Sequence, residues 1–147
     1  MKINFTKKEY ETLVEMLEIA NWIIDSDEET DKVEDGPYEA LSQKLLSYAK
    51  DFGFDEYVTY DKEVGKYYTT ADFEQNRTMK HIEVYDDYTF WHELSYRLAN
   101  RDLLKEYSEE KLRQMENYER YKLITGLEEK YDDEFENAGI DNLEIVK

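Results

Sequence analysis

An excess of carboxylates limits the kinds of structure that this chain can adopt. It carries 37 Asp and Glu against 19 Lys and Arg, which gives a formal net charge of -18 over 147 residues. Chains of this kind often stay disordered, because they cannot bury enough apolar surface to offset the loss of chain entropy. Leu, Ile, Val and Phe supply 33 residues, and 14 Tyr, 2 Trp and 4 Met add bulk that can fill a core. We therefore expect a single acidic, mainly helical domain over residues 1–147, with tyrosines at the margin of its core.

The N-terminal segment carries the signals of an amphipathic helix. Thr6 stands three residues before Glu9, in the arrangement of a capping box, so a helix is expected to begin there. The helix covers residues 7 to about 25, and its core-facing stripe recurs at helical spacing. The stripe consists of Leu13, Leu17, Ala20 and Ile24, widened by Val14, Trp22 and Ile23.

A second helix is expected after an acidic loop that ends at residue 36. Pro37 is typical of a first helical position, and Gly53 can take the left-handed conformation that ends a helix. The helix between them reaches about Asp51 and completes a helical hairpin with the first. Its buried stripe is expected to be Leu41, Leu45 and Tyr48.

Part of the middle of the chain has an amino-acid composition typical of strands and not of helices. β-Branched and aromatic residues become frequent from Tyr57 to Thr70, on both sides of the turn-like stretch from Asp61 to Gly65. This arrangement predicts a short β-hairpin. Residues 71–87 have a broken apolar pattern, which suits a short helix followed by a connection.

The C-terminal half predicts three more helices. Asp87 or Thr89 is expected to cap a long helix that ends near Tyr107. Ser108 is expected to cap a short helix, and Asn117 a last one. Their core-facing residues are Phe90, Trp91, Leu94, Leu98 and Leu104 on the long helix, and Tyr121, Ile124, Leu127, Tyr131 and Phe135 on the last.

Both ends of the chain are predicted to carry short strands. Gly139 followed by Ile140 is typical of a Schellman ending, in which Ile140 folds back on Phe135. Residues 143–146 then alternate as a strand does, and residues 3–5 are the nearest candidate partner. The predicted fold class is mainly α with a small β element. It comprises a helical hairpin, two or three further helices, short terminal strands and one β-hairpin.

Two patterns invite comparison with metal sites, and both are incomplete. Residues 25–36 alternate acids as an EF-hand loop does, but Thr30 replaces its glycine and Gly36 its last glutamate. The two histidines are His81 and His92, and the sequence after His92 lacks the second histidine of a zincin helix. We therefore predict neither a metal nor a cofactor.

The most site-like group of residues lies on the predicted long helix. His92, Tyr96 and Asn100 recur every four residues and share a helical face, with two arginines one turn apart beside them. Such a face can form a polar pocket in which arginines clamp an anion, although arginines in so acidic a chain usually pair with carboxylates. The candidate binding residues are Trp91, His92, Tyr96, Arg97, Asn100 and Arg101.

Charge and the absence of motifs narrow the function. A negative field repels phosphate backbones and anionic membranes and attracts basic surfaces, so we predict a basic protein partner, with no direct nucleic-acid binding and no membrane association. No apolar stretch has the length of a membrane span or forms a signal-peptide core, so the cytoplasm is the expected location. The chain has no Walker loop, dinucleotide fingerprint or G-x-S-x-G elbow, which leaves the enzyme classes marked by them unsupported.

These features together predict a non-catalytic protein-interaction module whose acidic surface binds a basic protein. A DNA-mimic inhibitor of a DNA-binding protein is the first alternative, because carboxylates arrayed on helices can imitate phosphates. A small metal-dependent or acid/base hydrolase is the second alternative, because isolated acids leave no sequence signature.

Overall fold

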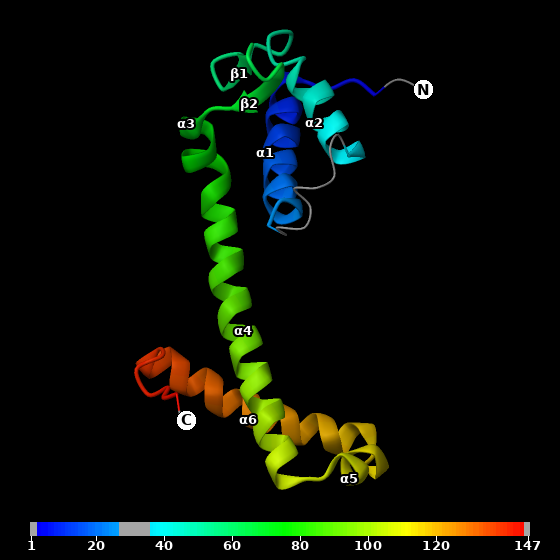
Figure 1. The fold of residues 1–147 in the computed structure, drawn as a ribbon, viewed down its shortest axis with the longest axis vertical. Coiled ribbons are helices and arrows are strands. Elements are labelled where there is room, and N and C mark those ends of the chain that lie inside the picture. Colours follow the sequence, from blue (N-terminus) through cyan, green and yellow to red (C-terminus); the bar gives the residue numbers. More distant parts are fainter. Residues whose placement is uncertain (1–2, 27–35, 146–147) are drawn as a thin grey trace. The chain divides into compact units, whose positions relative to one another are not determined.

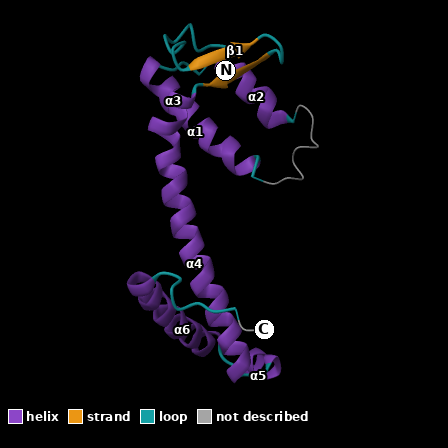
Figure 2. Ribbon diagram, turned by 60° about the vertical axis from the view of Figure 1, so that its left-hand side comes forward, coloured by secondary structure: helices purple, strands orange, loops and turns teal. Residues whose placement is uncertain are grey.

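A computed structural model describes residues 3–26 and 36–145. The chain forms two compact units, Met1–Val84 and Tyr85–Lys147. Within the described residues the structure is mainly helical with one two-stranded antiparallel sheet, which confirms the predicted fold class (Figures 1 and 2). None of the helices in this part of the chain has the length and apolar character needed to cross a membrane.

Helix α1 (Lys7–Ile24) begins where the capping box predicts it. The Thr6 hydroxyl accepts a hydrogen bond from the Glu9 amide at 3.3 Å, and the Glu9 carboxylate accepts one from the Thr6 amide at 2.7 Å. These bonds satisfy amide groups that have no partner inside the helix. The core buries Tyr10 and Val14 of this helix.

Helix α2 (Pro37–Leu46) also begins as predicted, with its proline in the first turn. It ends earlier than expected, and a series of turns carries the chain on to Gly53. Gly53 has a φ of 65°, so the left-handed conformation predicted for it is confirmed.

The face that α2 turns toward the core differs from the predicted one. Leu41 and Tyr48 are 52% and 46% exposed, so the prediction that they are buried is wrong. The buried residues are Ser42, Leu46 and Ala49. Gln43 holds the helix in this orientation, because its side-chain amide accepts a hydrogen bond from the Tyr67 amide at 2.7 Å and donates one to the Tyr67 carbonyl at 2.9 Å.

The predicted β-hairpin is confirmed. Strands β1 (Val58–Asp61) and β2 (Lys66–Thr69) pair antiparallel. The Asp61 carboxylate accepts a hydrogen bond from the Glu63 amide at 2.8 Å, and Gly65 has a φ of 77°. An aspartate that bonds its own turn and a glycine with positive φ are the usual residues of such a connection.

A continuous helical path follows the hairpin. Helix α3 (Ala71–Phe73), the π-helical segment η2 (Glu74–Thr78) and helix α4 (Met79–Glu106) succeed one another without a break. The prediction that a helix begins at Asp87 or Thr89 is therefore wrong, since both residues lie inside α4.

The π-helical segment explains why the sequence pattern looks broken there. The first buried residues of the path are Phe73 and Thr78, five residues apart, which is the spacing of the hydrogen bonds in a π-helix. Ile82 follows at the spacing of four that is usual in an α-helix. Arg77 strengthens this junction, because it forms ion pairs with two glutamates of α1, among them Glu15 at 3.0 Å. Contacts with α1 thus extend the helix back through a stretch that has little helical signal of its own.

Aromatic side chains form the core of the first unit. The Tyr10 ring stacks on Phe52 with ring centroids 4.3 Å apart and meets Phe54 edge-on at 5.8 Å. Phe54 in turn meets the Phe73 ring edge-on at 5.4 Å. Tyr10 is only 1% exposed, and its hydroxyl donates a hydrogen bond to the Leu45 carbonyl at 2.8 Å. A tyrosine therefore lies at the centre of this core as well as at its margin.

The second unit contains the later part of α4 and two further helices. Helix α5 (Glu109–Gln114) begins after Ser108, whose side chain caps it as predicted. Helix α6 (Asn117–Ala138) has Glu116 in the capping position, so Asn117 is its first residue and the prediction that Asn117 is the cap is wrong. The Trp91 ring lies 5.4 Å from the Phe135 ring and joins α4 to α6. The buried apolar residues are Ala99, Leu103, Leu112 and Phe135.

The predicted terminal strands do not form. Gly139 ends α6 with a φ of 56°, but Ile140 is 57% exposed, so the predicted packing of Ile140 is absent. Residues 3–5 and 143–145 contain no strand, and Ile145 is 94% exposed. The two ends belong to different compact units, and a short strand without a paired neighbour has no ladder of hydrogen bonds to stabilise it.

Candidate functional site

The six residues predicted to bind a ligand all lie on α4. The Trp91 indole N–H donates a hydrogen bond to Asp87 at 3.1 Å, while its ring packs against Phe135. The His92 ring stacks on Tyr88 with ring centroids 5.7 Å apart. These two aromatic side chains are engaged within the second unit, in contacts that fix their orientation.

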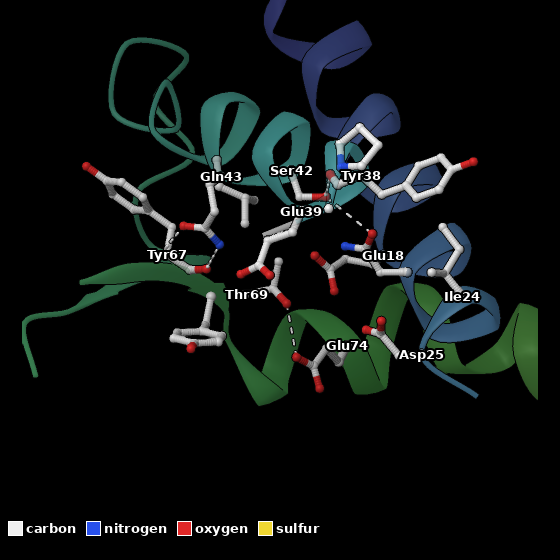
Figure 3. A pocket seen from close by; sticks show the side chains of 15 residues that line it. Glu18, Ile24, Asp25, Tyr38, Glu39, Ser42, Gln43, Tyr67, Thr69 and Glu74 are labelled. Atoms are coloured by element: carbon white, nitrogen blue, oxygen red, sulfur yellow. Dashed lines mark hydrogen bonds between the residues drawn. The ribbon is translucent and has the colours of Figure 1, made fainter. Parts of the chain in front are cut away.

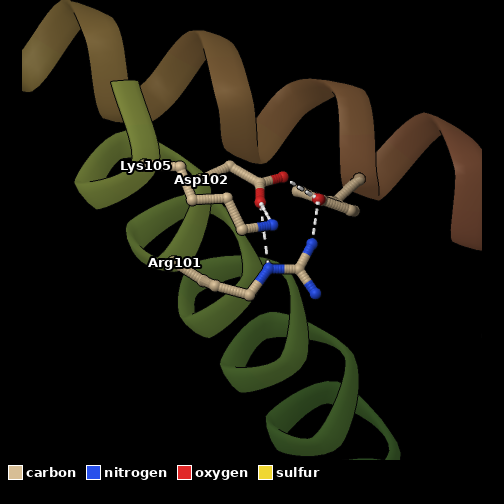
Figure 4. A network of polar contacts seen from close by, with 4 residues as sticks. Arg101, Asp102 and Lys105 are labelled. Carbon is tan, nitrogen blue, oxygen red and sulfur yellow. Dashed lines mark hydrogen bonds and ion pairs between the residues drawn. The ribbon is translucent and has the colours of Figure 1, made fainter. Parts of the chain in front are cut away.

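Both predicted arginines pair with carboxylates. The Arg97 Nε atom lies 3.1 Å from Glu93. The Arg101 Nε atom lies 2.9 Å from Asp102, and its Nη2 atom donates a hydrogen bond to the Tyr131 hydroxyl at 3.0 Å (Figure 4). A clamp for an anion would require both guanidinium groups to leave these partners.

Asp102 is the centre of a polar network that joins α4 to α6. Its carboxylate accepts hydrogen bonds from the Tyr131 hydroxyl, from Arg101 at 2.9 Å and from Lys105 at 2.9 Å. The bond from Arg101, followed by those from Tyr131 and Lys105, holds the pKa of Asp102 well below its usual range. Burial and then the contact with Asp102 raise the pKa of Tyr131. Because Arg101, Lys105 and the Tyr131 hydroxyl are all already engaged with Asp102, this network is best explained as a structural link.

The other two predicted residues line a cavity of the second unit. Tyr96 and Asn100 take part in the wall of a cavity of about 560 Å³, together with Leu104 and Tyr121. The cation in this wall is Arg120 of α6, which the sequence pattern on α4 does not reveal. The structure therefore brings two of the six predicted residues together at a cavity.

The two patterns compared with metal sites, the EF-hand-like loop and the histidines, lie in different parts of the chain. Within the described residues, no three His, Asp or Glu side chains are grouped closely enough to hold a metal ion. The acidic stretch that resembles an EF-hand loop includes residues 27–35, which lie outside the described residues.

A second cavity, which sequence reasoning does not predict, lies in the first unit. It has a volume of about 440 Å³ and is lined by side chains of α1, α2, β2 and η2 (Figure 3). Ile24, Pro37 and Leu46 give it apolar walls, and Tyr38 and Tyr67 contribute to its rim. Its carboxylates come from four places in the sequence. They belong to Glu18, Asp25, Glu39 and Glu74, and Figure 3 shows the side chains of Glu18 and Glu39 directed into the same space.

The charges of this lining are not balanced. No lysine, arginine or histidine belongs to the described part of the lining. Glu39 forms an ion pair with Lys66, and Glu74 accepts a hydrogen bond from the Thr69 hydroxyl at 3.0 Å. Among residues 3–26 and 36–145, no cation forms an ion pair with Glu18, Asp25 or Glu74. Three of the four carboxylates therefore face the cavity without a counterion from this part of the chain.

Glu18 shows the electrostatic consequence most clearly. Burial raises the pKa of its carboxyl above the ordinary value, and the negative charges of Glu74 and Asp25 raise it further. The hydroxyl of Thr69 acts in the opposite direction; its influence is smaller than that of burial but larger than that of either carboxylate. The site therefore disfavours the ionised form of Glu18, and a positive charge placed in the cavity would relieve this.

A smaller cavity of about 420 Å³ shares part of its lining with the first one. Both cavities are lined by Glu18, Asn21, Asp25 and Glu74. Trp22, Met79 and Ile82 add apolar surface to the smaller cavity. Two apolar hollows thus meet at a shared group of carboxylates.

Comparisons with known proteins add no information about this cavity. No family model, characterised protein or solved structure matches the chain.

Part of the cavity is visible in the sequence. Glu18, Asn21 and Asp25 are spaced three and four residues apart, so they share one face of α1. The spacing alone says nothing about Thr69 and Glu74, which the hairpin and the π-helical segment carry to the same place. The signal for the site is therefore split between segments that only folding brings together.

Proposed function

We propose that this chain is a non-catalytic protein-interaction module whose acidic surface binds a basic protein partner. The observation that carries the proposal is the cavity of the first unit, which is lined by four carboxylates and, within the described residues, by no cationic side chain. Carboxylates beside apolar and aromatic surface are the groups that recognise a basic segment with an aliphatic or aromatic neighbour. The net charge of -18 adds a long-range attraction that steers such a partner toward the surface.

The proposal can be tested by identifying the partner and measuring its affinity at two salt concentrations. The screening length falls from about 30 Å at 0.01 M ionic strength to about 10 Å at 0.1 M, so a complex held by charge should weaken over this range. Proteins captured from the native host at low salt would be identified by mass spectrometry. The binding of each purified candidate would then be measured by calorimetry at both concentrations, with an unrelated protein of similar net charge as the control.

A specific basic protein that binds this chain more tightly than the control, and less tightly at high salt, would support the proposal. If purified candidates bind the control equally well, the acidity is a solubility feature and the proposal fails. The DNA-mimic alternative gives a different result, because its partner would bind DNA and DNA would displace the acidic chain from it.

A further inference from the structure

The cavity of the first unit has the size and surface of a site for one side chain or a small ligand. Its volume of about 440 Å³ falls within the range of ligand pockets, which is roughly 300–1,000 Å³. Ile24, Pro37 and Leu46 can cover an aliphatic stem, and the carboxylates of the same lining can accept hydrogen bonds from its charged end.

Glu18 is the residue around which the site is organised. It belongs to both cavities of the first unit, so it lies where their two apolar surfaces meet. Asp25 lies two turns further along α1, and Glu74 reaches the same place from η2. Carboxylates from separate elements thus line the same two cavities, and their mutual repulsion opposes such an arrangement in the free protein.

We infer that this cavity receives a lysine side chain of the basic partner, with its ammonium group among the carboxylates of Glu18, Asp25 and Glu74. The inference rests on the proposed function and adds to it the place and the chemistry of recognition. The four-carbon stem lies against the apolar walls, and the ammonium supplies the charge that the described lining lacks.

An ammonium fits this arrangement better than a guanidinium does. A lysine ammonium is a compact charge with three donors that point in different directions, whereas a guanidinium presents a planar fork suited to one bidentate carboxylate. The acceptors here come from the C-terminal part of α1 and from η2, so they are oxygens of separate carboxylates and not of one. A metal ion is a poorer candidate, because it needs several oxygen ligands at about 2.0–2.6 Å, and the described residues contain no group of three ligands close enough for that. An ammonium binds acceptors at the longer distances of hydrogen bonds, about 2.7–3.2 Å.

The inference also explains why the fold retains a carboxylate whose ionised form is unfavourable in the free protein. An ionised Glu18 is unfavourable in the free protein, as the direction of its pKa shift indicates. Removing its charge should therefore leave the melting temperature unchanged or raise it, while binding is lost. A residue with a purely structural role would show the opposite, because its replacement would lower the melting temperature.

The test is a titration of the isotope-labelled full chain with small probes, followed by NMR. The probes are the tripeptides Gly-Lys-Gly, Gly-Arg-Gly and a norleucine analogue of equal stem length, together with n-butylamine. The proteins are the wild type, Glu18→Gln and the matched control Glu56→Gln, which removes the same charge from an exposed position of the same unit. Melting curves of all three proteins accompany the titration.

We expect Gly-Lys-Gly to shift the amide signals around Glu18, Asn21 and Glu74, and the norleucine peptide to leave them unchanged. Glu18→Gln should weaken the binding of Gly-Lys-Gly about tenfold, which corresponds to about 1.4 kcal/mol, and Glu56→Gln should leave it unchanged. Equal binding by both variants, equal binding of norleucine, or tighter binding of the arginine peptide would overturn the inference. n-Butylamine is the lysine side chain without its backbone, so it should bind at the same place, and a failure of n-butylamine to shift these signals would overturn the inference too. A melting temperature of Glu18→Gln below that of the wild type would also overturn the inference.

The inference and the proposed function can fail separately. If a basic partner binds with the expected salt dependence and Glu18→Gln binds it as the wild type does, the module stands and the lysine site does not. If Gly-Lys-Gly binds at Glu18 but no basic protein binds better than the control, the lysine site stands and its assignment to a protein partner does not.

Discussion

Replacing Tyr10 with phenylalanine tests how a chain with so few aliphatic residues stabilises its core. The Tyr10 hydroxyl donates a hydrogen bond of 2.8 Å to the Leu45 carbonyl, at the C-terminal end of α2. Phenylalanine keeps the ring that stacks on Phe52 but removes this bond from a carbonyl that still accepts one from the Tyr48 amide at 3.1 Å. The net contribution of one such hydrogen bond is about 0.5–1.5 kcal/mol, so Tyr10→Phe should lower the free energy of unfolding by that amount at neutral pH.

The same substitution should have a different effect in alkali. Burial raises the pKa of Tyr10 from 10.0 to about 12. The folded protein therefore holds this proton more tightly than the unfolded chain does, so its contribution to stability is complete below pH 10 and is lost as the pH rises to about 12. Two pKa units correspond to about 3 kcal/mol. Between pH 10 and about 12 the free energy of unfolding of the wild type should therefore fall by about 3 kcal/mol more than that of Tyr10→Phe. The two values should become equal or reverse their order.

The measurement is urea unfolding at several pH values between neutrality and about pH 12. A Trp91→Phe background leaves Trp22 of α1 as the single fluorescent indole, so the signal reports on the first unit. Tyr60→Phe is the matched control, because Tyr60 lies in the same unit and is 50% exposed. If the difference between the wild type and Tyr10→Phe stays constant with pH, or if Tyr60→Phe behaves in the same way, the buried hydroxyl does not have the role assigned to it.

Three further predictions concern the caps and the charge. Thr6→Ala removes the capping box of α1 and should lower the free energy of unfolding by about 1 kcal/mol in the urea assay, whereas Thr6→Ser should retain most of it. Gly53→Ala places a side chain at a φ of 65° and should destabilise by about 1 kcal/mol, while Gly126→Ala inside α6, where an added methyl group meets no atom within 4 Å, should be neutral or stabilising. Raising the ionic strength from about 0.01 M to about 0.1 M should raise the melting temperature, because it screens the repulsion among 37 acids. A melting temperature that falls with salt would show that attractive ion pairs outweigh this repulsion.

The local signals of the sequence determined where most elements begin and end. The capping box at Thr6, the proline at the start of α2, the serine before α5 and the glycines with positive φ all act within a few residues of themselves. Such interactions are nearly independent of the rest of the fold, so a reading of the sequence alone places them correctly. The β-branched and aromatic residues on both sides of the turn at Gly65 predicted the hairpin correctly, because they too are a local signal.

The tertiary structure decided which faces are buried and where the helical path continues. The buried side of α2 is set by the bonds of Gln43 to the backbone of Tyr67, and no spacing within α2 reveals them. The early start of α4 depends on the π-helical segment and on the ion pairs of Arg77 with α1, which are contacts between segments far apart in the sequence.

The candidate site follows the same division. Sequence reasoning did not single out Glu18, Asn21 and Asp25, although their spacing of three and four residues is that of one helical face. It did not show that Thr69 and Glu74 join them, nor that the cavity lining described in the structure offers no cation in return. A cavity exists only where several elements meet and leave space between them, so its position and charge are properties of the packed structure and not of any single segment.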